Sequence, residues 1–356
     1  MALVLFVVGL VFLIIGAEAL VRGASRMAGA MGISPLVIGL TVVAFGTSSP
    51  ELAVSTKSAL VGQADIAVGN VVGSNIFNVL FILGVSALIV PLVVAQKLLR
   101  LDVPLMIGLS VLTLVFAYDG QFSRLDGVIL LLGLVVYVAF LIYASRQESA
   151  AERQEDANAL VDSAAGGFGW LKNMALVVVG LVLLVLGSRW FVDSAVAFAQ
   201  YMGISEMVIG LTIVAAGTSL PEVVTSIIAA LRGERDIAVG NVVGSNIFNI
   251  MGVLGLASLM APACIEISAA VMHFDIPVMI VVAFACLPIF FTGGAISRGE
   301  GAVLLAYYVA YTAYLVLSAS RHDALPIVST ALMYFAIPLT ALTLAIIVWR
   351  EWRGRG

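Results

Sequence analysis

Long apolar segments recur along the whole chain, separated by short breaks that contain Gly, Pro or charged residues. Each segment is close to the roughly 20 residues that an α-helix needs to cross a hydrocarbon core of about 30 Å. The pattern therefore predicts eleven membrane-spanning helices. They lie near residues 2–22, 34–60, 66–90, 102–118, 126–145, 171–192, 205–231, 237–259, 274–292, 300–319 and 326–349.

One polar stretch interrupts this pattern. Residues 146–170 combine seven charged residues with Ala, Ser and Gly, a composition typical of a flexible linker. We expect a five-helix unit at residues 1–145, a cytoplasmic linker at 146–170, a second five-helix unit at 171–320, and an additional helix with a basic tail at 321–356. If the N-terminus lies outside, 13 of the 17 Lys and Arg residues face the cytoplasm, which is the bias seen in membrane proteins. The C-terminus is then inside, and the expected location is the plasma membrane.

Composition supports the membrane assignment and narrows the partners. Hydrophobic residues make up 62% of the chain and charged residues only 11%, against roughly 25% charged in a typical soluble domain. The net charge of −4 and the absence of a basic stripe exclude a nucleic-acid surface. The chain carries no motif for a cofactor and none for an obligate protein partner. The lipid bilayer is the expected surrounding.

The two halves contain copies of one sequence. At a shift of 171 residues, positions 34–78 align without a gap to positions 205–249, with 31 identities in 45 positions. The run from Asp65 to Asn78 recurs unchanged from Asp236 to Asn249. Five spans precede the linker, so the second copy enters the membrane from the opposite side. Such inverted repeats are the architecture of many secondary transporters, in which broken helices bind substrate near the midplane. The predicted fold is therefore an all-α polytopic membrane protein with two inverted five-helix repeats and one extra C-terminal helix.

Two polar clusters interrupt the apolar helices of each repeat. The first contains Thr47, Pro50 and Glu51, and its copy contains Thr218, Pro221 and Glu222. A carboxylate inside a membrane span is costly unless it is paired or hydrated, so each Glu is a candidate functional residue. Each Pro cannot donate to the carbonyl four residues earlier, at Gly46 or Gly217, which leaves that oxygen available.

The second cluster adds a Ser and an Asn four residues apart, on one helical face: Ser74 with Asn78, and Ser245 with Asn249. All of these groups offer oxygen, and none offers sulfur or imidazole. Hard oxygen ligands suit Ca²⁺, and Na⁺ accepts similar neutral oxygens. The alternative is purely structural, because Ser and Thr often bond their own helix and small residues allow close helix packing. Two symmetric buried carboxylates favour the cation site.

These strings carry a family resemblance. The paired GTSxPE and GNVVGSNIFN motifs resemble the alpha repeats of the sodium/calcium exchanger family, within the cation/calcium antiporter superfamily, and the similarity covers nearly the whole chain. The resemblance implies ten core helices, alternating access, and exchange of Na⁺ for Ca²⁺. It implies calcium ligands at Glu51 and Glu222 with the backbone oxygens of Thr47 and Thr218. The sodium sites it implies draw also on Ala44, Ser48, Ser74, Ala215, Ser219 and Ser245.

The chain departs from some relatives at one central position. Asn78 and Asn249 occupy the polar places in the middle of the motif, where potassium-dependent relatives carry Asp at the second. With two carboxylates and not three, K⁺ co-transport is not expected. The eleventh helix also lies beyond the ten-helix core of the family.

Four functions compete. The leading interpretation is an electrogenic Na⁺/Ca²⁺ antiporter that extrudes Ca²⁺, and the runner-up is a Ca²⁺/H⁺ or other divalent cation/H⁺ antiporter of the same fold. Proton-coupled relatives are expected to show a GNxxE motif, whereas Gly73 stands three residues after Asn70. An intramembrane hydrolase needs a base near Ser48 or Ser219, and neither His has motif context there. A passive channel does not require broken helices in inverted repeats. The protein is thus predicted to be a transporter and not an enzyme.

Overall fold

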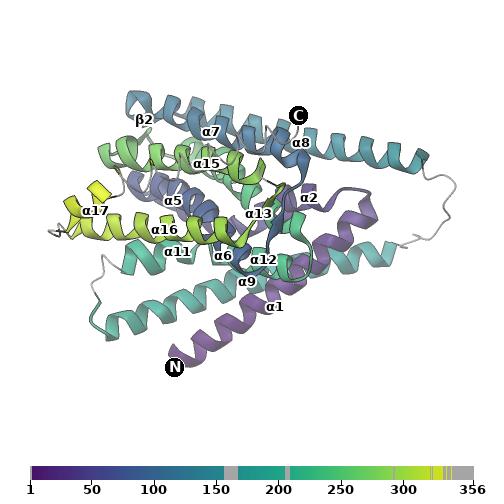
Figure 1. Ribbon diagram of the computed structural model, residues 1–356, viewed down its shortest axis with the longest axis horizontal. Helices are drawn as coiled ribbons and strands as arrows, with labels where there is room; N and C mark the ends of the chain where they lie inside the picture. Colours follow the sequence, from purple (N-terminus) through teal and green to yellow (C-terminus); the bar gives the residue numbers. More distant parts are fainter. Residues whose placement is uncertain are drawn as a thin grey trace.

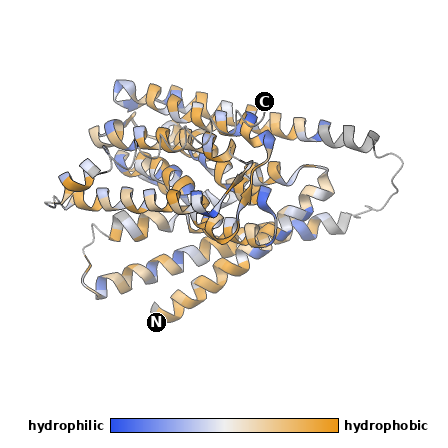
Figure 2. Ribbon diagram, in the orientation of Figure 1, coloured by the Kyte–Doolittle hydropathy of each residue, from blue (hydrophilic) through white to orange (hydrophobic). Residues whose placement is uncertain are grey.

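A computed structural model describes residues 2–155, 167–204, 209–291, 293–320, 322, 324–331, 334 and 338. Hydrophobic residues dominate the helices, as Figure 2 shows. The elements of the first half are α1 (Ala2–Met31), α2 (Pro35–Ile38), η1 (Gly39–Val43), α3 (Ala44–Thr47), α4 (Ser49–Leu60), α5 (Ala64–Phe77), η2 (Asn78–Leu83), α6 (Gly84–Ile89), β1 (Leu92–Val93), η3 (Leu98–Asp102), α7 (Val103–Phe116), η4 (Ala117–Asp119), β2 (Gln121–Phe122) and α8 (Arg124–Glu155).

The second half repeats this order. Its elements are α9 (Gly167–Tyr201), η5 (Gly210–Val214), α11 (Ala215–Gly217), α12 (Leu220–Leu231), α13 (Arg235–Phe248), η6 (Asn249–Leu254), α14 (Gly255–Met260), β3 (Ile265–Glu266), η7 (Val271–Asp275), α15 (Ile276–Phe291), β4 (Ala295–Ile296), α16 (Arg298–Ala319) and α17 (Leu325–Ala331). Even the short π-helical stretches recur: η1 matches η5 and η2 matches η6 at the same shift of 171 residues. Local helix widening is therefore a property of the repeated sequence, and such π stretches often mark functional sites.

Eight described helices are long and apolar enough to cross a membrane, and nine if the bent pair Pro35–Thr47 and Ser49–Leu60 counts as one span. The other two of the eleven predicted spans are incompletely described. The span expected at 205–231 includes residues 205–208, and most of the span expected at 326–349 lies outside the described residues. The all-α polytopic fold is confirmed.

The stretch 146–170, expected as a linker, contains helical residues at both of its ends. Helix α8 continues to Glu155 and helix α9 already begins at Gly167. The sequence after residue 146 is rich in Ala, Glu, Gln and Arg, which are good helix formers, so a charged composition alone did not end the helix. Residues 156–166 lie outside the described part of the chain.

Helices α1 and α9 lie side by side along one flank of the molecule (Figure 1). Glycines bring the two backbones together. A Cβ placed on Gly9 would lie 2.8 Å from the carbonyl oxygen of Gly187, and one on Gly16 would lie 2.8 Å from that of Gly180. Small residues that allow close backbone approach are a common basis of helix association in membranes.

Two short antiparallel sheets join loops of the two halves at the ends of the bundle. Strand β1 pairs with β4, and Leu92 lies opposite Ile296. Strand β2 pairs with β3, and Gln121 lies opposite Glu266. Each sheet takes one strand from each half, which is consistent with inverted repeats.

An Asp–Tyr pair is also present in each half, buried in the first half and partly buried in the second. The Tyr137 hydroxyl donates to Asp102 Oδ1 at 2.8 Å, and the Tyr311 hydroxyl donates to Asp275 Oδ1 at 2.9 Å. These pairs lie outside the gap-free sequence repeat, so the motif comparison did not find them.

Helices α5 and α13 occupy the centre of the bundle. Figure 1 shows them between α7 and α15 on one side and α9 and α12 on the other. All residues of α13 from Ile237 to Phe248 are buried. The repeated motif thus lies where two halves of the molecule meet, and most of its polar side chains have no access to water or lipid.

Candidate functional site

The first polar cluster of each repeat lies at a helix break. The helical segments Pro35–Thr47 and Ser49–Leu60 meet at an angle of 48°, with Ser48 between them at φ −80° and ψ 10°. Ser219 has nearly the same conformation in the second repeat, at φ −90° and ψ 9°. Pro50 and Pro221 follow two residues later and lack the N–H that a continuous helix would use. Each break therefore brings a Ser and a Glu into the interior.

The two carboxylates are held crosswise between the repeats. The Ser48 hydroxyl donates to Glu222 Oε1 at 2.9 Å, and the Ser219 hydroxyl donates to Glu51 Oε1 at 2.6 Å. Ser219 also lies 3.2 Å from the hydroxyl of Ser74. Both carboxylates are fully buried. Because each Glu depends on the Ser of the opposite repeat, the site exists only where the two halves meet.

A second crosswise contact involves the Asn residues that follow Gly69 and Gly240. Thr47 donates to Asn241 Oδ1 at 3.1 Å, and Thr218 donates to Asn70 Oδ1 at 3.4 Å. The amide groups of the same two Asn residues donate to Ser226 and Ser55, at 3.0 and 2.9 Å. Asn70 and Asn241 were not predicted as site residues, although the unchanged repeat contained both.

Ten buried side-chain oxygens have no hydrogen-bond partner among the described residues, and five of them belong to the predicted site residues. These five are Glu51 Oε2, Glu222 Oε2, Asn78 Oδ1, Asn249 Oδ1 and Ser245 Oγ. Buried polar atoms are almost always hydrogen-bonded, so a group of unpaired oxygens requires an explanation. All five are oxygen atoms of the kind that bind hard cations, and both repeats contribute to them. Only the two carboxylates among them carry a formal charge. The chemistry of this donor set suits a hard cation.

The predicted site residues fall into two groups by burial. Thr47, Ser48, Glu51, Ser74, Asn78, Ser219, Glu222, Ser245 and Asn249 are buried, and so is Ala44. Thr218 is only partly buried and Ala215 is exposed. The pairs Ala44 with Ala215 and Thr47 with Thr218 are equivalent in sequence, so their unequal burial shows that the two repeats are packed differently against their surroundings.

Helix packing shows the same asymmetry. A Cβ placed on Gly244 would lie 2.7 Å from the backbone of Leu40, so η1 packs directly onto α13. At Gly73, the equivalent position of α5, no described atom lies within 4 Å of such a Cβ. The motif is therefore closed along α13 and more open along α5, toward the end of the bundle that carries the turn between α4 and α5.

The two carbonyls released by proline were expected to be available as ligands. In the second repeat the Gly217 carbonyl accepts a hydrogen bond from Ser188 of α9 at 2.7 Å, which occupies one of its two acceptor positions. Ser188 lies far from the motif in sequence, and its contact depends on how α9 packs against the broken helix.

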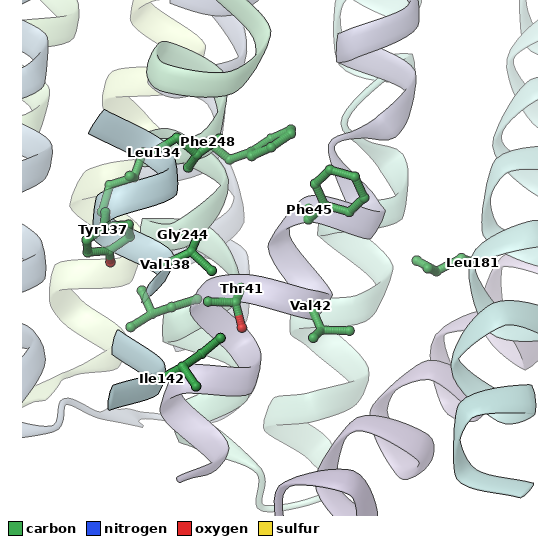
Figure 3. A pocket seen from close by; sticks show the side chains of 12 residues that line it. Thr41, Val42, Phe45, Leu134, Tyr137, Val138, Ile142, Leu181, Gly244 and Phe248 are labelled. Carbon is green, nitrogen blue, oxygen red and sulfur yellow. The ribbon is translucent and has the colours of Figure 1, made fainter. Parts of the chain in front are cut away.

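A separate cavity of about 360 Å³ lies beside the break in the first repeat (Figure 3). Its wall is apolar apart from Thr41 and Tyr137. Thr41 donates to the Val37 carbonyl and Tyr137 donates to Asp102, so both hydroxyls already have partners. The cavity therefore provides no set of cation ligands and is distinct from the carboxylate site.

Comparisons with known proteins agree with this geometry. The family model described as sodium/calcium exchanger protein matches residues 1–143 and 172–317. The inner membrane protein YrbG of Escherichia coli is 40% identical, over 88% of this chain and 97% of its own length. The sodium/calcium exchanger MaX1 of Methanosarcina acetivorans is 37% identical, over 86% of this chain and 96% of its own.

The structural similarity is equally extensive. A structure of the sodium-calcium exchanger NCX_Mj soaked with Na⁺ and Ca²⁺ superposes with a TM-score of 0.74 and 31% identity, over 88% of this chain and 97% of that chain. The extent of these matches, on both sides of the linker, shows that the chain belongs to the sodium/calcium exchanger family.

Proposed function

We propose that this protein is a secondary antiporter that exchanges external Na⁺ for cytoplasmic Ca²⁺ by alternating access, and that the exchange is electrogenic. Both ions are substrates. The proposed location is the plasma membrane, with the N-terminus outside and the C-terminus inside. The family is one of cation/Ca²⁺ antiporters, which supports a transporter over the hydrolase alternative.

The observation that carries the proposal is the group of unpaired buried oxygens around two carboxylates. Glu51 and Glu222 together supply two negative charges, which match the charge of one Ca²⁺. Among the described residues no group of three or more His, Cys, Asp or Glu side chains is placed to hold a metal. The charge of this site is thus set by two Glu, while Ser and Asn add neutral oxygens of the kind that Ca²⁺ and Na⁺ accept.

The difference between the repeats supports alternating access. The same motif is packed against η1 at Gly244 and is open at Gly73. In an inverted-repeat transporter, exchange of these two conformations between the halves moves the opening from one side of the membrane to the other. A passive channel has no need for two conformations of one motif.

The relatives support sodium as the coupling ion. One is named a sodium/calcium exchanger, and the solved structure was soaked with Na⁺ and Ca²⁺. Both Asn78 and Asn249 are neutral here, so a third carboxylate is missing and we expect no K⁺ co-transport.

The alternative is a Ca²⁺/H⁺ or other divalent cation/H⁺ antiporter. Two facing carboxylates are able to carry protons, and a 39% identical relative from Alkalimonas amylolytica is named only as a putative antiporter. Gly73, in place of an acidic residue three positions after Asn70, favours sodium.

One transport assay distinguishes these readings. Purified protein is reconstituted into liposomes loaded with Na⁺, with K⁺, or with choline at acid internal pH, and uptake of radioactive Ca²⁺ is followed. Uptake driven by internal Na⁺ alone supports the proposal. Uptake driven by the acid interior and indifferent to Na⁺ would replace it with the proton-coupled alternative, and equal uptake under all conditions would indicate a passive pathway.

A further inference from the structure

Four Asn side chains form a closed, crosswise network at the crossing of α5 and α13. Asn75 Nδ2 donates to the backbone carbonyl of Asn246 at 3.3 Å, and Asn246 Nδ2 donates to the backbone carbonyl of Asn75 at 3.3 Å. Asn75 Oδ1 accepts from Asn249 Nδ2 at 3.1 Å, and Asn246 Oδ1 accepts from Asn78 Nδ2 at 2.9 Å. All four side chains are buried.

The network fixes which end of each amide faces which neighbour. Backbone carbonyls are acceptors only, so the NH₂ groups of Asn75 and Asn246 must point toward them. Each of these NH₂ groups also contacts a methionine sulfur, that of Met279 at 3.6 Å for Asn75 and that of Met106 at 3.4 Å for Asn246. Reversing either amide would place its oxygen against two acceptors.

The orientation is then passed on to the second pair. With Asn246 Oδ1 fixed as an acceptor, Asn78 must present its NH₂ group to it, and its own oxygen is turned away. The same holds for Asn249 opposite Asn75. The two oxygens turned away, Asn78 Oδ1 and Asn249 Oδ1, are the ones that lack a partner among the described residues. A carbonyl oxygen is a ligand for a hard cation, whereas an NH₂ group is not.

We propose that Asn75 and Asn246 are positioning residues, which hold the amides of Asn249 and Asn78 so that an oxygen and not an NH₂ group faces the transported cation. Each acts on the ligand of the opposite repeat. This inference rests on the proposed function, because it assumes that the unpaired oxygens bind a cation. It assigns a role to two residues of the repeated motif that are not among the predicted ligands.

The test is a double-mutant cycle read out by cation binding. Asn246→Leu keeps a similar shape and removes the acceptor that orients Asn78, while Asn78→Ala removes the ligand oxygen itself. Purified variants in detergent are titrated with Ca²⁺ in Na⁺-free buffer, and in parallel with Na⁺, and the rise of the melting temperature gives the apparent affinity. Thr113→Val is the matched control, since Thr113 is buried on α7 but bonds only to its own helix.

We expect each single substitution to lower the cation affinity about tenfold. The double variant should lose no more affinity than the single variant that binds less tightly. The coupling should be crosswise: Asn75→Leu should show the same non-additivity with Asn249→Ala and a smaller one with Asn78→Ala, although Asn75 and Asn78 share one chain segment. The control should bind like wild type. Transport in liposomes should show the same shifts in half-saturating Ca²⁺ with maximal rates largely retained.

Several results would overturn the inference. A merely structural role predicts a lower melting temperature without cation and an unchanged cation dependence. Independent roles predict that the tenfold losses multiply to about a hundredfold in the double variant. If Asn246→Leu does not fold, Asn246→Ser and Asn75→Ser make the same comparison. A wild-type protein that responds to neither ion would refute the proposed function itself, which is a different outcome from a responsive wild type without crosswise coupling.

Discussion

Replacing one buried carboxylate by its neutral isostere tests the site most directly. Glu51 and Glu222 occupy equivalent places, and each accepts from one Ser of the opposite repeat through Oε1 while Oε2 lacks a partner among the described residues. In Glu51→Gln, the hydrogen bond from Ser219 keeps the amide oxygen at the Oε1 position. The NH₂ group then takes the place of Oε2. The substitution thus removes one charge and one ligand oxygen together.

The size of the effect follows from burial. Removing one partner of a buried charge pair typically costs about 3–5 kcal/mol, because the remaining charge is left uncompensated. If Ca²⁺ and the carboxylate behave as such a pair, apparent Ca²⁺ affinity should fall roughly 10²- to 10⁴-fold. Pseudo-symmetry predicts similar losses for Glu51→Gln and Glu222→Gln, in spite of the difference in packing between the repeats.

The assay is Na⁺-driven Ca²⁺ uptake into liposomes, together with the Ca²⁺-dependent rise of the melting temperature in detergent. Glu266→Gln is the control, since Glu266 is exposed at the short sheet between β2 and β3. Both site variants should elute as folded protein and fail to exchange. Near wild-type half-saturation by Ca²⁺ in either variant would refute the assignment of the carboxylates. A large loss in one and none in the other would refute the symmetric site.

Three further predictions concern the coupling ion, the potential and the topology. External K⁺ should leave wild-type transport unchanged, and K⁺-stimulated Ca²⁺ flux in the wild type would contradict this prediction. Asn249→Asp should make transport more sensitive to pH. An ionised Asp at this place would face Asn75 Oδ1, an acceptor that lies 3.1 Å from the present NH₂ group of Asn249. If three Na⁺ bind the two-carboxylate site, the loaded site carries about one positive charge, and an inside-negative potential assists its inward step by about 2.3 kcal/mol per 100 mV; an equilibrium reversal point that does not move with voltage would rule this stoichiometry out. In a cysteine-free background, a cysteine at exposed Gln147 should react only from the cytoplasm and one at exposed Tyr118 only from outside; the opposite labelling pattern would reverse the orientation.

Sequence repetition indicates the candidate site because the repeated polar and charged residues are types that membrane helices rarely bury. A Glu inside an apolar span, with Pro one residue before it and Thr four residues before it, is unusual. Its recurrence with the same neighbours at residue 222 makes the signal much stronger. The shift and the number of spans together also predict that the two copies run in opposite directions through the membrane. Fold class and the principal polar residues followed from these patterns.

The partners within the site could not be derived in the same way. The repeat shows that Ser48 corresponds to Ser219, but it does not show that each donates to the carboxylate of the opposite copy. Asn75 and Asn246 were overlooked because an Asn beside a Gly–Ser pair reads as packing until its neighbours across the interface are known. Ser188 belongs to no recognisable motif, and its contact with Gly217 follows only from the packing of α9.

Identical motifs that are packed unequally raise the question of what distinguishes the two ends of the bundle. The run Asp65 to Asn78 and its copy have the same sequence, so contacts within the motif alone give no preference for either end. A preference must come from flanking residues that differ. Arg232, at the end of α12, forms an ion pair with Glu18 of α1, and Ser25 donates to Glu234 at 2.6 Å.

These contacts have no possible equivalent at the opposite end. At the shift of 171 residues, Val61 corresponds to Arg232, Gln63 to Glu234, and Arg189 to Glu18. An exposed ion pair is worth only about 0–1 kcal/mol, yet a symmetric site needs no larger difference for one arrangement to be more populated than the other. Because the ligand motif has the same sequence in both repeats, we expect flanking contacts such as those between α1 and the end of α12 to decide which arrangement is more populated.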